Sequence, residues 1–244
     1  MNKTLENEHS ELNKNSHFLV IIPAYNEEEN IKEVVLRSKK YADVCVINDK
    51  SRDATPDILN SIYGIHVIHH KKNTHIPGGL LDGMRYAVEQ GYEYAIAIDA
   101  GLSHNPDEIP RFINHPPADL VMGVREEKNN TPLFRSVLSK TGNFIYNISL
   151  DFPQSLFKKR YYKDITTGYR RYSHKAMQLL LSRKMQSRSF DILLETAMYI
   201  YKNRLLISEV PITYAFSNSS LNPNIVKDCI KMSLRLIFYS KKFK

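Results

Sequence analysis

The sequence predicts an α/β domain in which helices flank a mixed, mainly parallel sheet. Short runs of strand-forming apolar residues alternate along the chain with amphipathic segments of helical periodicity, which is typical of parallel sheets. The length of 244 residues, 42% of them hydrophobic, is enough to bury the core of one large domain. Polar clusters directly follow several apolar runs, as expected where strands end at the ligand-binding edge of an open sheet.

The amino-terminal half contains four apolar runs that predict strands. We expect them at 18–22, 44–47, 65–68 and 94–98. Pro23 is expected to end the first strand, because proline cannot donate to a central ladder. Asn26 is expected to cap the helix that follows, Thr55 to begin a second helix, and a third is expected over 79–90, ended by Gly91.

The carboxyl-terminal half continues the alternation. Strands are expected at 119–122, 168–172 and 205–212, and helices at 132–150, 175–182 and 191–202, with a loop over 151–163. We divide the chain into a disordered polar tail at 1–16, one domain at 17–222 and a basic amphipathic helix at 223–244. The tail lacks the apolar segment of a secretory signal, so a cytoplasmic location is expected.

Composition limits the possible partners. The chain has 34 basic and 26 acidic residues, a net charge of +8 that favours an anionic partner. Its basic residues are dispersed rather than interleaved with aromatic ones, which argues against nucleic acid. Cys45 and Cys229 predict neither a disulfide framework nor a zinc site. No apolar run is long enough to cross a bilayer, so any membrane contact is expected to be peripheral.

Three polar clusters follow predicted strands, at 23–27, 48–53 and 99–104. Tyr25 offers an aromatic face for a base, and Asp49 could accept a hydrogen bond from a base or a ribose. Asp99 follows a strand where a metal-bound diphosphate would need a carboxylate. Taken singly, the cluster at 48–53 is more typical of a polar turn, and an Asp at a strand end is more often a helix cap.

The clusters form an ordered series with two later motifs. The series is Val20-Ile-Ile-Pro-Ala-Tyr-Asn-Glu27, Val46-Ile-Asn-Asp-Lys-Ser51, Ile98-Asp-Ala-Gly-Leu-Ser-His104, Asp164-Ile-Thr-Thr-Gly-Tyr-Arg170 and Glu209-Val-Pro-Ile212. It resembles the glycosyltransferase-A (GT-A) fold of glycosyltransferase family 2. Within that family, it is most similar to the polyprenyl-phosphate sugar transferases typified by dolichol-phosphate mannose synthase.

The resemblance implies an inverting enzyme that moves a sugar from a nucleotide-sugar donor to a polyprenyl phosphate or a related membrane-associated acceptor. It implies Mg²⁺ or Mn²⁺ bound by Asp99, and an enzyme at the inner face of the membrane. The nucleotide sugar would be held by Pro23, Tyr25, Glu27, Asp49 and Asp99. The acceptor phosphate would be held by Arg125, Arg135, Ser139 and Arg170. Catalysis would rest on Asp99, Arg125 and Arg135.

The chain departs from the family pattern in three places. Gly101 stands where the second Asp of an Asp-x-Asp motif is usual, which removes a metal ligand. Asn48 replaces an Asp, and Ser217 lies near a position where Arg is common. The first departure keeps open a catalytically inactive binding protein of the same fold. A nucleotidyltransferase or a dinucleotide-dependent oxidoreductase is disfavoured, because no glycine-rich phosphate loop follows the first strand.

Two further alternatives stay open. If the acceptor is a sugar hydroxyl of a glycan, a carboxylate must take its proton, and Asp164 and Glu195 are the candidates. The segment 224–244 predicts a helix with basic residues at intervals of four and an apolar face that either packs on the core or lies on a membrane. Its apolar residues are Val226, Ile230, Leu234, Ile237 and Phe238, and its basic ones Lys227, Lys231 and Arg235.

Overall fold

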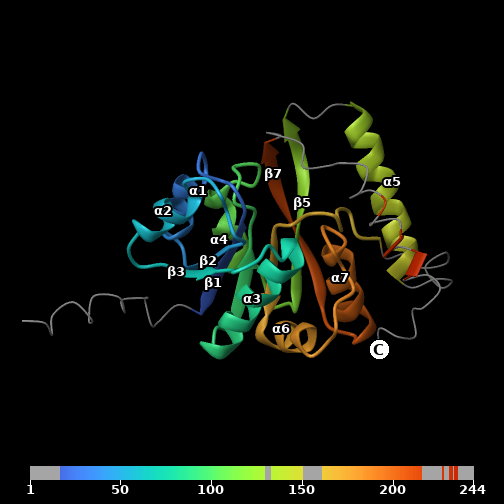
Figure 1. The fold of residues 1–244 in the computed structure, drawn as a ribbon. Coiled ribbons are helices and arrows are strands. Elements are labelled where there is room, and N and C mark those ends of the chain that lie inside the picture. The colour runs from blue at the N-terminus through green and yellow to red at the C-terminus, as the bar shows by residue number, and fades with distance from the viewer. Residues whose placement is uncertain are drawn as a thin grey trace, which may run out of the picture.

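The computed structural model describes residues 17–129, 133–150 and 161–215, together with Lys227, Lys231, Met232, Leu234 and Arg235. Its strands are β1 (Phe18–Ala24), β2 (Asp43–Asn48), β3 (His66–His69), β4 (Tyr94–Ala97), β5 (Leu120–Asn129), β6 (Arg170–Ser173) and β7 (Ile207–Ala215). Its helices are α1 (Ile31–Ser38), α2 (Thr55–Asn60), α3 (His75–Glu89), η1 (Pro106–Glu108), α4 (Ile109–Ile113), α5 (Leu133–Leu150), α6 (His174–Leu181) and α7 (Ile192–Lys202). Figure 1 shows their arrangement.

The strands form one seven-stranded sheet in the order β3-β2-β1-β4-β6-β5-β7. Strands β1 to β4 are parallel to one another, and β5 is parallel to β7. Strand β6 lies between β4 and β5 and is antiparallel to both. The predicted α/β fold with a mixed, mainly parallel sheet is therefore confirmed.

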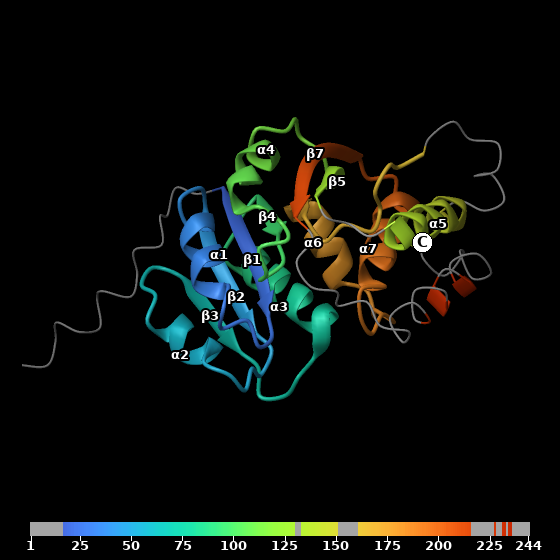
Figure 2. The same ribbon diagram turned by 90° about the horizontal axis from the view of Figure 1, so that it is seen from above.

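Helices cover both faces of the sheet, as the view from above shows (Figure 2). One apolar core joins the sheet to α3, α6 and α7, and includes Leu80, Met177 and Ile192. The other joins it to α1, α2 and α4, and includes Val34 and Phe112. Two-sided burial explains why β2 has consecutive apolar residues between its polar ends rather than an alternating pattern. Among the described residues, no helix combines the length and apolar character that a bilayer crossing requires.

Two local predictions at the end of β1 were wrong. Pro23 does not end the strand, because β4 pairs with β1 only as far as Ile21, and beyond it β1 pairs with β2 alone. Asn26 does not cap α1, which begins at Ile31. Its side chain instead accepts a hydrogen bond from the backbone N–H of Arg52 at 2.8 Å. A tertiary contact has therefore replaced the local cap.

Consecutive arginines on β6 are buried on opposite sides of the sheet, because successive strand residues point to opposite faces. Arg170 donates to the carbonyl oxygens of Ile165, Thr167 and Leu193 at 2.6 to 2.9 Å. Arg171 donates to the carbonyls at the end of α4 and in the loop after it. The side chain of Arg170 is thus inaccessible and occupied in this structure, which argues against the predicted contact with an acceptor phosphate.

Replacing Arg170 with lysine should lower the free energy of unfolding by about 3 kcal/mol, because an ammonium cannot satisfy carbonyls that lie in several directions. Urea unfolding at neutral pH would measure the loss. Arg188→Lys, at an exposed position, is the matched control and should change stability little. Unchanged stability together with a raised acceptor KM in Arg170→Lys would restore the acceptor role to this residue.

Candidate functional site

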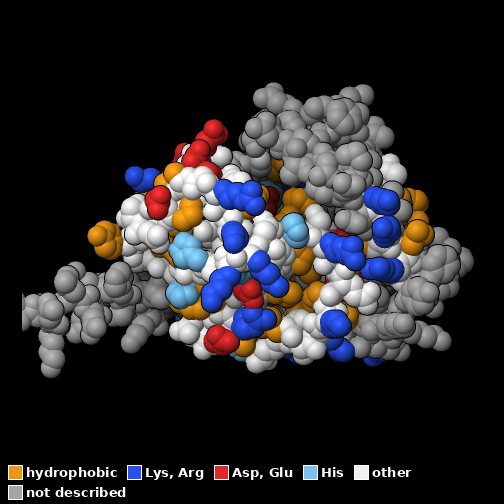
Figure 3. Space-filling model, in the orientation of Figure 1, with side chains coloured by type: hydrophobic (Ala, Val, Ile, Leu, Met, Phe, Trp, Pro, Cys, Tyr) orange, Lys and Arg blue, Asp and Glu red, His pale blue; other side chains and the backbone are white. Residues whose placement is uncertain are grey.

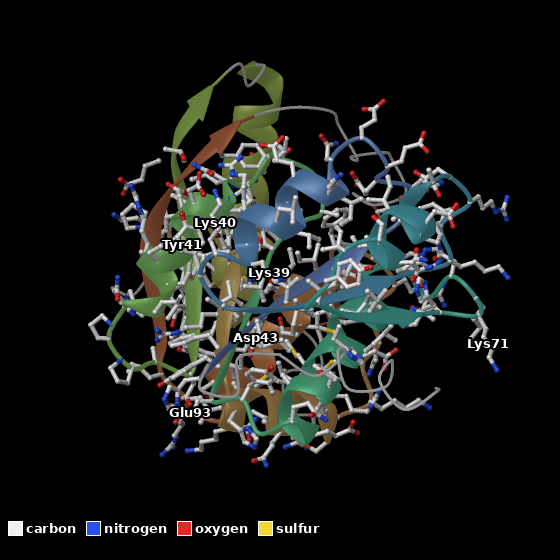
Figure 4. All side chains as sticks on the ribbon, turned by 90° about the vertical axis from the view of Figure 1, so that its left-hand side faces the viewer. Lys39, Lys40, Tyr41, Asp43, Lys71 and Glu93 are labelled. Carbon is white, nitrogen blue, oxygen red and sulfur yellow. The ribbon has the colours of Figure 1, made fainter. Side chains whose placement is uncertain are left out.

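The candidate site lies at the carboxyl ends of the parallel strands. In Figure 4, Asp43 at the start of β2 and Glu93 just before β4 lie toward one side of the molecule. Lys71, beyond the end of β3, lies on the other side. The loops that follow β1, β2 and β4 therefore share one edge, as the polar clusters predicted.

Backbone N–H groups of the loop after β1 donate hydrogen bonds to side-chain hydroxyls of the segment after β2. The N–H of Asn26 donates to Ser51 Oγ at 2.9 Å, and the N–H of Glu27 donates to Thr55 Oγ1 at 2.9 Å. Tyr25, between Pro23 and this contact, exposes 45% of its surface, so its ring is available for stacking. Of the predicted donor-binding residues, Pro23 lies near the end of β1, and Tyr25 and Glu27 lie on the loop that these hydrogen bonds hold in place.

Asp99 follows β4 and is held by a histidine. Its Oδ2 lies 3.0 Å from His104 Nδ1, and 49% of the Asp99 side chain is exposed. The His104 ring is buried against the rings of Tyr169 and Tyr214. Gly168 lies so close that a Cβ there would come within 3.0 Å of Asp99 Oδ1. Because Gly168 has no side chain, the Thr-Gly-Tyr motif leaves room for the Asp99 carboxylate.

The electrostatic surroundings keep Asp99 charged. Desolvation by the surrounding protein raises its pKa, but the charge and hydrogen bond of His104 and the charge of Arg125 outweigh this effect. The net pKa is below that of an ordinary aspartate. An accessible carboxylate that is ionised at neutral pH suits a cation or a hydrogen-bond donor.

Asp49 makes contacts that the sequence did not predict. Its Oδ1 accepts hydrogen bonds from the Thr74 N–H at 2.7 Å, the Thr74 hydroxyl at 2.9 Å and His70 Nδ1 at 2.8 Å. Only 4% of Asp49 is exposed. This carboxylate therefore anchors Thr74, the residue before α3, and the helix begins at His75 rather than at the predicted 79.

Arg125, on β5, is fixed by a two-pronged ion pair. Its Nε and one terminal nitrogen donate to the two carboxylate oxygens of Asp164 at 2.6 and 2.8 Å. The same terminal nitrogen donates to the Thr166 hydroxyl at 2.6 Å. The guanidinium lies over the Tyr214 ring, 5.2 Å from its centroid. Burial lowers the pKa of Arg125, but Asp164 more than offsets this effect, so the guanidinium stays charged.

Tyr214 connects the two parts of the site. Its ring contacts the Arg125 guanidinium on one side and the His104 ring, 5.5 Å away between centroids, on another. Through His104 the contact reaches Asp99. Sequence reasoning missed Tyr214, as it missed His70 and Thr74; His70 directly follows β3 and could have been found as a strand-end polar residue.

Asp164 and Glu195, the two acids considered as general bases, both accept hydrogen bonds from other groups of the protein. Desolvation raises the pKa of Asp164, but Arg125 and Thr166 outweigh it and hold the net pKa below its usual range, which makes a weak base. Glu195 is fully buried and accepts from the backbone N–H groups of Gln186 and Ser187. Neither carboxylate is placed to take a proton from a sugar hydroxyl.

Two predicted acceptor residues cannot be placed in the site. Arg135 and Ser139 belong to α5, but their side chains lie outside what the structure describes. In the carboxyl-terminal segment, Met232 is buried in the core, whereas Lys227, Lys231, Leu234 and Arg235 are exposed. At Met232 the segment packs on the core, and its described basic residues face outward.

Known proteins resemble this chain over most of its length. The UDP-N-acetylglucosamine–dolichyl-phosphate N-acetylglucosaminyltransferase of Methanococcus voltae is 29% identical over 227 residues, covering 83% of this chain and 87% of that protein. The undecaprenyl-phosphate mannosyltransferase of Micrococcus luteus is 28% identical over 227 residues, covering 87% of this chain and 90% of that protein.

The fold is also found among solved structures. Glucosyl-3-phosphoglycerate synthase from Mycobacterium tuberculosis, in complex with Mn²⁺, UDP-glucose and phosphoglyceric acid, superposes with a TM-score of 0.63. The superposition covers 91% of this chain and 78% of that one at 15% identity, so this likeness concerns the fold. Residues 19–179 match the sequence pattern of glycosyl transferase family 2. The chain therefore belongs to glycosyl transferase family 2 and is a glycosyltransferase of the GT-A fold.

Proposed function

We propose that this glycosyltransferase moves a sugar from a nucleotide-sugar donor to a polyprenyl phosphate, with inversion at the anomeric carbon. The two relatives named above are transferases whose names specify dolichyl and undecaprenyl phosphates. The observation that carries the proposal is the Arg125–Asp164 pair beside Asp99. In this pair the Arg125 guanidinium is held in a position to bind a phosphate. The same pairing lowers the pKa of Asp164, which makes it a weak general base.

The donor lies, in this proposal, over the loops after β1, β2 and β4. Tyr25 stacks on the base or ribose, and Glu27 lies on the same loop, facing the donor. Asp49, being almost fully buried, contributes chiefly by fixing the start of α3 beside this loop. Asp99 lies at the diphosphate end of the site, next to the acceptor half.

The acceptor phosphate supplies its own nucleophile. Its oxyanion is already ionised near neutral pH, so attack on the anomeric carbon requires positioning and charge stabilisation rather than proton removal. Arg125 orients that phosphate and balances its charge through a planar fork that suits phosphate oxygens. Arg135 and Ser139 of α5 remain proposed partners of the same phosphate.

The residues at the diphosphate end suit a divalent cation. Asp99 presents an ionised, half-exposed carboxylate, and Mg²⁺ and Mn²⁺ prefer oxygen ligands of this kind. Such a cation supplies charge neutralisation on the departing diphosphate. Asp99 would hold it, while His104 keeps the carboxylate in one orientation.

A location at the inner face of the membrane belongs to the same proposal. Lys227, Lys231 and Arg235 are spaced by four residues, are exposed and could meet anionic lipid headgroups. Other Lys and Arg side chains are spread over the face that carries α3, α6 and α7, rather than gathered in one stripe (Figure 3).

A donor screen followed by a transfer assay tests the proposed function. We expect one of UDP-, GDP-, CMP- or dTDP-sugars to raise the melting temperature, because a ligand that binds only the native state stabilises it. With that donor and Mn²⁺, radiolabelled sugar should pass into an organic-extractable polyprenyl phosphate. Binding of the donor without transfer to any lipid phosphate or glycan would instead favour the inactive binding protein.

A further inference from the structure

We infer that Glu27 supplies the second carboxylate for the divalent cation at Asp99, in place of the acid that Gly101 lacks. The inference rests on the proposed function, because it concerns the cation that accompanies the donor diphosphate. It assigns the ligand to a different segment, since Glu27 follows β1 whereas Asp99 and Gly101 follow β4.

The first support is the position of the Glu27 carboxylate. A Cβ built on Gly101 would lie 3.9 Å from Glu27 Oε2, so this oxygen sits beside the space into which an acid at 101 would project. The Glu27 backbone is fixed by its hydrogen bond to Thr55, which holds the residue at this edge. The Glu27 carboxylate therefore lies close to the position that the side chain of an aspartate at 101 would occupy.

The second support is the electrostatic coupling of Glu27 to Asp99. The negative charges of the Glu27 and Asp99 carboxylates interact with each other. Two carboxylates that repel each other across a shared space are stabilised when a cation enters that space. The pair is therefore costly without a cation and favourable with one.

The third support comes from His104. Its side chain is only 3% exposed, and its Nδ1 faces Asp99 Oδ2 at 3.0 Å. A buried imidazole that faces a half-exposed carboxylate in this way resembles the outer partners that orient metal-binding carboxylates.

The described residues do not form a complete cage. Among them, no group of three or more His, Cys, Asp and Glu side chains is arranged to hold a metal by itself. Mg²⁺ and Mn²⁺ commonly bind through one or two carboxylates and complete their shell with water and substrate phosphates. Glu27 and Asp99 therefore fit a cation that binds tightly only together with a nucleoside diphosphate.

The test measures Mn²⁺ binding by the loss of the free-ion electron paramagnetic resonance signal, with Mn²⁺ alone and with UDP or GDP added. We expect Glu27→Gln to weaken Mn²⁺ binding by about tenfold or more in the presence of the nucleotide. Glu29→Gln, an exposed acid in the same loop, is the matched control and should bind as the unaltered protein does.

A rescue variant makes the test specific. Gly101 has no positive φ, and its nearest neighbour in the space for a side chain is Glu27 at 3.9 Å, so aspartate fits there. We expect Gly101→Asp to restore Mn²⁺ binding in the Glu27→Gln protein. A merely structural role of Glu27 would not be rescued in this way, and melting temperatures without metal would confirm that each variant is folded.

The outcomes separate this inference from the proposed function. Undiminished Mn²⁺ binding by Glu27→Gln, with loss in Asp99→Asn, would overturn the inference and leave the transferase proposal intact. Sugar transfer that proceeds without any divalent cation would do the same. If no nucleotide sugar binds and no transfer occurs, the proposed function fails, and Mn²⁺ binding by the Glu27 and Gly101 variants still decides the inference.

Discussion

Replacing Asp99 with asparagine is expected to lower kcat/KM for sugar transfer about 1,000-fold, which corresponds to about 4 kcal/mol of transition-state stabilisation. Asparagine keeps the shape of the side chain but removes the charge that faces His104 and the proposed diphosphate. Because the pKa of Asp99 is lowered, the carboxylate is ionised throughout the neutral range. The loss should therefore be the same at pH 6 and pH 8.

Initial rates with saturating donor and varied acceptor, at both pH values, would measure this effect. Asp57→Asn is a suitable control, because Asp57 is an exposed acid in the first turn of α2. A fall of less than about tenfold in Asp99→Asn would mean that the negative charge contributes little to the transition state, since tenfold corresponds to about 1.4 kcal/mol. The proposed cation and diphosphate contacts would then have to be assigned elsewhere.

Removing the guanidinium of Arg125 is expected to lower kcat/KM for a polyprenyl-phosphate acceptor by about 100- to 1,000-fold, the effect of losing one fixed donor to a developing charge. Arg125→Gln alone would also leave Asp164 buried without its cation, which destabilises the fold. The double variant Arg125→Gln, Asp164→Asn replaces the ion pair with two neutral amides. It should regain most of the melting temperature but none of the activity.

Parallel measurements of melting temperature and acceptor kinetics distinguish the two roles of this pair. Arg111→Ala, an exposed arginine on α4, provides the control and should leave transfer unchanged. If the double variant recovered activity together with stability, Arg125 would be a structural residue, and the acceptor phosphate would have to be held by α5. If only stability returned, the charge itself would be required.

The sequence predicted the sheet because its signals were local. The apolar runs of β1, β2 and β4 and the stripe on α3 are short-range patterns, and the polar residues after them marked the correct edge. The runs at 205–212 and 191–202 similarly corresponded to β7 and α7. Local patterns could not show what a strand-end side chain would contact, because those partners lie far along the chain.

The errors at individual residues follow from this limit. Arg170 matched a family motif, but its inaccessibility depends on the position of β6 between two other strands and on α7 beneath it. Asp49 was expected to face the nucleotide, yet its strongest partners, Thr74 and His70, lie in a segment without a clear periodic pattern. Tyr214 was missed because it lies two residues past the predicted end of the last strand.

Strand β6, which runs antiparallel to both of its neighbours, separates β4 from β5 in the middle of the sheet. Asp99 follows β4 and Arg125 lies on β5, and these two strands flank β6 instead of pairing with each other. Neighbouring strands lie about 4.8 Å apart, so their axes are separated by about 10 Å. The donor and acceptor halves of the proposed site therefore extend from strands whose separation is set by the hydrogen bonding of the sheet rather than by a surface loop.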